Sequence, residues 1–140
     1  MLKQISIFVE NKSGRLCAVM ETLAEAKIDV RAMTIADTAE FGIVRLIVND
    51  AEKAANALKE NSFTVKVTEV IAFTIPDHFG ALYDVIKLLG ENGINIEYSY
   101  SLMGKNQKEA DIVIKVADAK RAGEILAGAG VKLIEIEDVV

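Results

Sequence analysis

The chain has little of what metal sites and covalent cross-links need, with one cysteine, one histidine, one proline and no tryptophan among 140 residues. The single cysteine, Cys17, cannot form an internal disulfide, and its place in a helical pattern predicts a small, buried apolar side chain. Cys17 and His78 together supply too few nitrogen and sulfur ligands for a tetrahedral zinc ion. We therefore expect no metal and no cofactor.

Basic residues are also scarce, since 16 Lys and Arg stand against 21 Asp and Glu and leave a net charge of −5. Binding a nucleic-acid duplex requires a dense basic surface, so this balance argues against nucleic acid and against anionic lipid surfaces. No apolar run approaches the roughly 18 residues that span a bilayer. The first residues lead directly into an alternating pattern and not into a signal peptide. We expect a soluble cytoplasmic protein.

What the chain does have is an internal repeat. The segment Val9–Leu16 recurs as Ile75–Leu82, and Gly14 and Gly80 lie 66 residues apart. Towards the C-terminus the offset becomes 68, which aligns Asp50 with Asp118 and Leu58 with Leu126. The two extra residues are expected in the polar stretch 104–107, where a hairpin loop can absorb them. The sequence predicts two copies of one unit, residues 1–68 and 69–140.

Each copy shows the same order of periodicities. In the first, an alternating strand pattern is followed by apolar residues at helical spacing, by two β-branched segments, by a second helix that Asp50 can cap, and by a last strand. The corresponding segments are Gln4–Val9, Leu16–Leu23, Ile28–Ile35, Phe41–Val48, 51–58 and 63–67. This order, βαββαβ, predicts an α+β fold of two ferredoxin-like units, each an antiparallel sheet with both helices on one face.

Some apolar residues fall on the sheet face away from these helices. The alternation places Ile43 and Ile47 there, and we expect Phe8 and Met33 to join them. Such a face needs a cover, which predicts a homodimer. A monomer in which the two copies cover one another is the alternative.

The turn after the first strand of each copy is the strongest candidate for a binding site. It reads Asn11-Lys12-Ser13-Gly14-Arg15-Leu16 in one copy and Asp77-His78-Phe79-Gly80-Ala81-Leu82 in the other. Glycine lets a ligand approach the backbone, and the amides of a helix N-terminus attract a carboxylate. An oxygen of Asn11 or Asp77 could accept from an ammonium, so the pair of groups describes an α-amino acid. The alternative is that Asn11 and Asp77 simply cap the helix.

The exit of the next helix is the second feature. It reads Glu91-Asn92-Gly93-Ile94-Asn95-Ile96, and Gly93 is suited to the left-handed residue that ends a helix. Asn95 is then expected at the start of the second strand, as a polar residue between two isoleucines. The first copy has Ala26-Lys27-Ile28-Asp29-Val30 at the same place.

Asp77-x-x-Gly80-x-Leu82 followed by Gly93-Ile94-Asn95-Ile96 resembles the signature of the ACT domain family, and the resemblance covers the whole chain twice. It implies an amino-acid site where two modules meet side by side. The turn of one module would face the second-strand start of the other. By position, the first half-site would be Asn11, Ser13, Gly14, Arg15 and Leu16, or Asp77, Phe79, Gly80, Ala81 and Leu82. The second half-site would be Asp29 and Val30, or Asn95 and Ile96.

The resemblance implies an amino-acid-binding regulatory or sensor protein without catalysis of its own, with a metabolic enzyme as a candidate partner. One histidine, one cysteine and no matched acid–base set support the absence of catalytic residues. A partner subunit that binds an enzyme and no metabolite is one alternative. An acylphosphatase-like enzyme is another, because those enzymes place an arginine in the first turn as Arg15 is placed here. The chain lacks their phosphate loop, however, and its second copy has Ala81 at this position.

Overall fold

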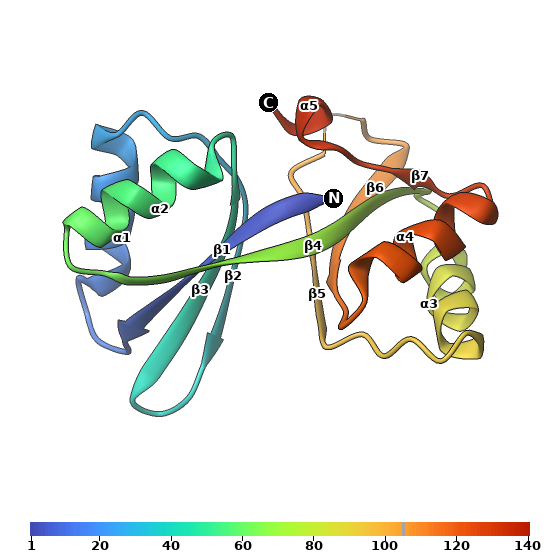
Figure 1. Ribbon diagram of the computed structural model, residues 1–140, viewed down its shortest axis with the longest axis horizontal. Coiled ribbons are helices and arrows are strands. Elements are labelled where there is room, and N and C mark those ends of the chain that lie inside the picture. Colours follow the sequence, from blue (N-terminus) through green and yellow to red (C-terminus); the bar gives the residue numbers. More distant parts are fainter. Residues whose placement is uncertain (105) are drawn as a thin grey trace. The chain divides into compact units, whose positions relative to one another are not determined.

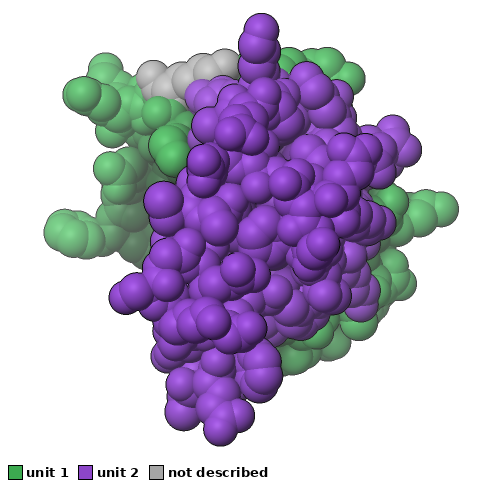
Figure 2. Space-filling model, turned by 90° about the vertical axis from the view of Figure 1, so that its left-hand side faces the viewer, with its two compact units in different colours: residues 1–2, 69–140 green, residues 3–68 purple. Residues whose placement is uncertain are grey.

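A computed structural model describes residues 1–104 and 106–140 (Figure 1). The chain divides into two compact units, which we call the N-terminal unit (residues 3–68) and the C-terminal unit (residues 1–2 and 69–140), coloured purple and green in Figure 2. The elements are β1 Leu2–Glu10, α1 Arg15–Glu25, β2 Val30–Asp37, β3 Phe41–Val48, α2 Ala51–Glu60, β4 Thr64–Pro76, α3 Ala81–Glu91, β5 Tyr98–Ser101, β6 Glu109–Lys115, α4 Ala119–Gly128, β7 Lys132–Leu133 and α5 Ile136–Val139.

The N-terminal unit contains an antiparallel sheet with helices α1 and α2 on one face (Figure 1). β3 lies between β1 and β2, and β4 is the neighbour of β1 on its other side. The helix-facing residues of β1 and β3 alternate, as the sequence predicts, and they pack with the inner residues of both helices. The buried core includes Ile5, Ile7, Val44, Leu46, Val19, Leu23, Ala54 and Leu58.

The C-terminal unit repeats this arrangement with its own strands. β6 lies between β4 and β5, all antiparallel, and the short β7 pairs with β4. Helices α3 and α4 cover one face. Its buried core includes Ile71, Phe73, Ile75, Val85, Leu89, Ile114, Ala122 and Leu126.

Strand register shows that the two units are copies of one another. Ile5 lies opposite Leu46 in the N-terminal unit, and Ile71 lies opposite Ile114 in the C-terminal unit. The offsets are therefore 66 on the first strand and 68 on the third, and the hairpin pairs β2–β3 and β5–β6 keep the same two offsets. The two extra residues lie in the β5–β6 connection, where the sequence predicts them, although Lys105 itself lies outside the described residues. The α+β prediction with repeated ferredoxin-like units is confirmed.

The predicted caps of the second helix in each copy are also confirmed. The side chain of Asp50 accepts from the N–H of Lys53 at 3.0 Å, and that of Asp118 accepts from the N–H of Arg121 at 3.0 Å. Each carboxylate satisfies a backbone donor that the helix leaves without a partner.

Three expectations about individual elements are wrong. Cys17 is exposed, because α1 buries Val19 and Leu23 and turns Cys17 away from them. Met33 lies opposite Leu46 and so shares the helix-facing side of the sheet, where it is 46% exposed on the outermost strand. In the C-terminal copy the last strand is reduced to Lys132–Leu133, after which the chain forms α5.

Candidate functional site

The N-terminal turn runs from the end of β1 to the start of α1. Gly14 has φ of 87°, a left-handed conformation that glycine adopts without the steric cost a Cβ brings. The N–H of Asn11 donates to the carbonyl of Glu40 at 2.9 Å, and the N–H of Lys12 donates to the carbonyl of Glu10 at 2.9 Å. These bonds fix the turn against the β2–β3 hairpin.

The C-terminal turn has the same backbone. Gly80 has φ of 85°, the N–H of Asp77 donates to the carbonyl of Lys108 at 2.9 Å, and the N–H of His78 donates to that of Pro76 at 3.0 Å. Each hydrogen bond has its counterpart at the offsets of the repeat. Both copies therefore present the same turn to a ligand.

Neither turn is closed by a capping side chain. Gly14 and Gly80 are the N-cap residues of α1 and α3, and no side-chain hydrogen bond caps either helix. The interpretation of Asn11 and Asp77 as helix caps is therefore wrong. In α3, the N–H groups of Leu82 and Tyr83 precede the first intrahelical bond, which Asp84 donates to Gly80. These free N–H groups carry the positive end of the helix dipole and favour an anion.

The side chains around the N-terminal turn bind one another. Lys12 forms an ion pair with Glu10 at 3.0 Å, and this hydrogen-bonded cation lowers the pKa of the Glu10 carboxyl. The guanidinium of Arg15 lies over the ring of Phe63, 5.2 Å from its centroid. Arg15 is half-buried in this contact, and its Nε has no hydrogen-bond partner among the described residues.

The equivalent side chains around the C-terminal turn are different. Pro76, His78, Ala81 and Val131 stand where the N-terminal copy has Glu10, Lys12, Arg15 and Phe63. A cavity of about 540 Å³ opens here, lined by Ala81, Val131 and the charged Asp84 and Lys132 among others. Asp77 is exposed with no side-chain bond within the described residues, and Phe79 is fully exposed.

The second-strand starts also differ. In the N-terminal unit the N–H of Asp29 donates to Oδ1 of Asn49 at 2.9 Å, and the Asp29 carboxylate pairs with Arg31 at 3.3 Å. In the C-terminal unit Ala117 stands at the position of Asn49, and its side chain has no oxygen to accept the equivalent hydrogen bond. Asn95 is exposed and precedes β5, which begins only at Tyr98, so its expected place at the start of the second strand is wrong.

The residues that follow α1 and α3 have the same backbone conformation in both copies, although they are of two types, lysine and glycine. Lys27 has φ of 57° and Gly93 has φ of 73°, both left-handed. The two apolar candidates beside Asp29 and Asn95 take part in the structure of their own units. Val30 lies opposite Val48 in the sheet, and Ile96 packs against the C-terminal core.

The two predicted half-sites are not adjacent within a unit. The turn and the second-strand start lie at opposite ends of an 11-residue helix, α1 in one copy and α3 in the other. At 1.5 Å per residue such a helix separates them by about 16 Å. The two candidate half-sites of one unit are therefore too far apart for a single amino acid to touch both.

Among the described residues, no group of three or more His, Cys, Asp or Glu side chains is arranged to hold a metal ion. None of the helices in the same residues is both long and apolar enough to cross a membrane.

The duplicated βαββαβ units, each with a glycine turn leading into its first helix, define a pair of ferredoxin-like modules. A family model described as an ACT domain pair matches residues 1–140, and the chain belongs to the ACT domain family. A search of curated proteins finds no match.

Solved structures give the same fold. Protein BT0572 from Bacteroides thetaiotaomicron is 43% identical, with a TM-score of 0.92 over 99% of this chain and 94% of that one. The ligand-free regulatory subunit of aspartate kinase from Thermus thermophilus is 16% identical, with a TM-score of 0.63 over 91% of each chain. A structure of aspartokinase alpha and beta subunits is 18% identical, with a TM-score of 0.60 over 91% of this chain and 92% of that one.

Proposed function

We propose that this protein is a regulatory sensor that binds a free α-amino acid and has no catalytic activity of its own. The observation that carries the proposal is the C-terminal turn, where, among the described residues, the N–H groups of Leu82 and Tyr83 have no backbone partner and the exposed Asp77 carboxylate has no side-chain bond. The N–H groups suit a ligand carboxylate, and Asp77 suits an ammonium. The similarity to the regulatory subunit of an aspartate kinase supports a role in amino-acid metabolism. A location in the cytoplasm is part of the proposal.

The complete site is proposed to form between two modules, because one unit holds its two half-sites about 16 Å apart. Gly80 and Leu82 would bind the ligand carboxylate with their backbone, Ala81 would lie beside them with its N–H donated to the carbonyl of His78, and Asn95 of a neighbouring module would add a polar contact. The N-terminal positions would make the equivalent site from Asn11, Gly14 and Asp29. Because Asp29 already pairs with Arg31 and Asn49, we propose that the site built from C-terminal residues binds more tightly.

We propose that the protein forms a homodimer to bring modules together. β2 and β5 end the strand order of the described residues, so each leaves one edge of backbone groups for pairing. Met33 and Ile35 on β2 are each 46% exposed and would be covered by such an association. Sedimentation measurements over a range of concentrations test this, and a monomer at every concentration would contradict it.

A partner subunit without a metabolite remains the second candidate function, and a specific observation favours it. Phe79, Leu82, Tyr83 and Ile86 follow helical spacing and are all exposed, by 105%, 41%, 64% and 46%. A metabolic enzyme could bind this apolar surface of α3 directly.

A thermal-unfolding screen of the common amino acids separates the two functions. A ligand that binds the folded state must raise the unfolding temperature in a concentration-dependent way. Calorimetry on Asn95→Ala, with Asp29→Ala as its matched control, then tests the site. We expect Asn95→Ala to weaken binding about tenfold and Asp29→Ala to have a smaller effect, as the loss of a hydrogen bond to a charged group costs about 1.5 kcal/mol. If no amino acid gives heat or stabilisation, the partner-subunit function replaces the sensor.

A further inference from the structure

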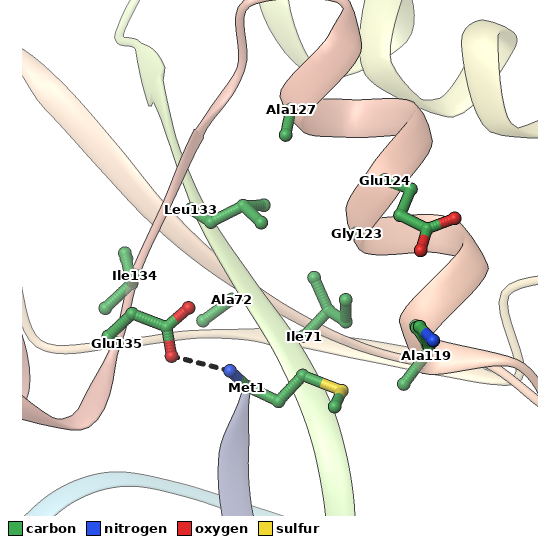
Figure 3. Close-up of a pocket in the computed structure, with 11 residues that line it drawn as sticks. Met1, Ile71, Ala72, Ala119, Gly123, Glu124, Ala127, Leu133, Ile134 and Glu135 are labelled. Atoms are coloured by element: carbon green, nitrogen blue, oxygen red, sulfur yellow. Dashed lines mark hydrogen bonds and ion pairs between the residues drawn. The ribbon is translucent and has the colours of Figure 1, made fainter.

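A different cavity lies inside the C-terminal unit, between α4 on one side and β4 and β7 on the other (Figure 3). Its volume is about 360 Å³, within the range of roughly 300–1,000 Å³ that small-molecule sites occupy. The floor is apolar, because it is formed by the buried Ile71 and Ile134 and by Leu133. In Figure 3 the side chains of Ile71 and Leu133 extend towards α4.

The opening exists because α4 presents very small residues to this floor. Gly123 is buried there, and a Cβ on it would lie 3.1 Å from Cδ1 of Ile71. Ala127 lies one turn further along the same side of α4. The N-terminal copy has Ala55 and Lys59 at these two positions, so the same space is not built into its sequence.

Charged groups at the rim are of both signs. Glu135 is already neutralised, since its carboxylate binds the Met1 ammonium at 2.6 Å. Lys120 and Glu124 lie one turn apart on α4, and neither forms an ion pair with any described residue. Among the described residues, the cavity therefore offers Lys120 and Glu124 as a cation and an anion without an ion-pair partner, above an apolar floor.

We propose that this cavity binds an α-amino acid with a small aliphatic side chain. The side chain would occupy the apolar floor, the ammonium would bind Glu124, and the carboxylate would bind Lys120. A charged side chain is excluded, because burying it against Ile71 and Leu133 would leave it without a hydrogen-bond partner. This site is separate from the glycine turn and needs no second module.

Calorimetry of the full chain with L-leucine tests the proposal, with two analogues that each lack one charge. We expect 4-methylpentanoate, which lacks the ammonium, and 3-methylbutylamine, which lacks the carboxylate, each to bind at least about tenfold more weakly than leucine. L-Aspartate should not compete with leucine. Equal binding of leucine and both analogues would overturn the zwitterion assignment.

Variants locate the binding. Ala127→Leu fills the cavity and should weaken leucine binding at least about tenfold, whereas Ala24→Leu, the same change at an exposed position of α1, should leave it unchanged. Glu124→Gln, at an exposed position, should weaken leucine but not 4-methylpentanoate, and it keeps the test open if Ala127→Leu unfolds. Leucine binding that is lost in Asp77→Ala but intact in Ala127→Leu would assign the ligand to the turn and overturn this proposal. Absence of any leucine heat would also overturn it, while leaving the turn site open to other amino acids.

Discussion

The two strand-to-helix turns have one backbone and two sets of side chains. In the N-terminal turn Lys12 pairs with Glu10 and the Arg15 guanidinium lies over Phe63, while Arg15 Nε has no hydrogen-bond partner among the described residues. The C-terminal turn replaces these groups by Pro76, His78, Ala81 and Val131 and leaves Asp77 exposed. A duplicated fold thus keeps its backbone hydrogen bonds in both copies, while the Lys12–Glu10 and Arg15–Phe63 side-chain contacts are made in only one of them.

The second-strand starts differ in the same direction. Asp29 is held by Asn49 and Arg31, whereas Asn95 is exposed and precedes the strand. These two differences lie about 16 Å apart along the intervening helix, so a single substitution does not account for both. The comparison shows that Asp29 has two side-chain partners in the N-terminal copy, whereas the equivalent Asn95 is exposed in the C-terminal copy.

The cores provide the largest expected effect and should not distinguish the copies. Leu58 and Leu126 are matched positions, each with no exposed surface. We expect Leu58→Ala and Leu126→Ala each to lower the free energy of unfolding by about 2–5 kcal/mol, through lost burial and a cavity. Urea unfolding measures this. A loss below about 1 kcal/mol in one copy alone would show that its core is not the equivalent of the other.

The turn glycines come next. A Cβ on Gly14 or Gly80 would meet no atom within 4 Å, so an alanine there is opposed only by the left-handed backbone. Gly14→Ala and Gly80→Ala should each lower the free energy of unfolding by about 1–2 kcal/mol. Ligand titration of the same two proteins then separates the copies, because only Gly80→Ala should also weaken amino-acid binding strongly. Equal weakening by both would contradict the asymmetry.

Substitutions at the residues that follow α1 and α3 should change the free energy of unfolding in opposite directions. Lys27 adopts a left-handed conformation that disfavours any side chain, whereas Gly93 has the same conformation without this cost. Lys27→Gly should therefore raise the free energy of unfolding by up to about 1 kcal/mol, and Gly93→Lys should lower it by about 1–2 kcal/mol. Thermal unfolding of both variants tests this. A destabilised Lys27→Gly protein would mean that the Lys27 side chain makes a compensating contact.

The smallest effect concerns the ion pair that only the N-terminal turn possesses. Lys12 lowers the pKa of Glu10 below its ordinary value of 4.5, so the folded state binds this proton less tightly than the unfolded state does. The pair's stabilising contribution is thus present above pH 4.5 and is lost as the pH falls through the lowered pKa. Glu10→Gln and Lys12→Met should remove the same small pH-dependent component, and added salt should shrink it in the parent protein. Variants whose pH profiles differ from one another would show that the two side chains do not act as a pair.

Local patterns in the sequence predict most of the fold. The alternation in β1 and β3 and the caps Asp50 and Asp118 depend on residues that are close in the chain. The offsets of 66 and 68 follow from comparing these local patterns between the two copies. The same spacing places Gly14 and Gly80 at equivalent turns. The short β7 and the additional α5 are not predictable in this way. The last strand of the first copy instead suggests a strand of similar length at the equivalent place in the second copy.

The candidate site is less accessible to such patterns, because its state depends on distant residues. Phe63 is 48 positions from Arg15 in the chain, yet its ring contacts the Arg15 guanidinium. Asn49 is 20 positions from Asp29 and decides whether the second-strand start is open. Aligning the two copies shows that Val131 replaces Phe63 and that Ala117 replaces Asn49. The sequence does not show which contacts these replacements remove, because the partner residues are distant in the chain.

The most direct test of the asymmetry is the affinity of Asp77→Ala and Asn11→Ala for the amino acid that stabilises the parent protein. Removing a charge-assisted contact costs about 1.5–3 kcal/mol, so Asp77→Ala should weaken binding about ten- to a hundredfold. Asn11→Ala should change it less than about threefold, because that turn is occupied by its own side chains. Equal effects, or a larger effect of Asn11→Ala, would contradict the assignment of the open site to the C-terminal copy.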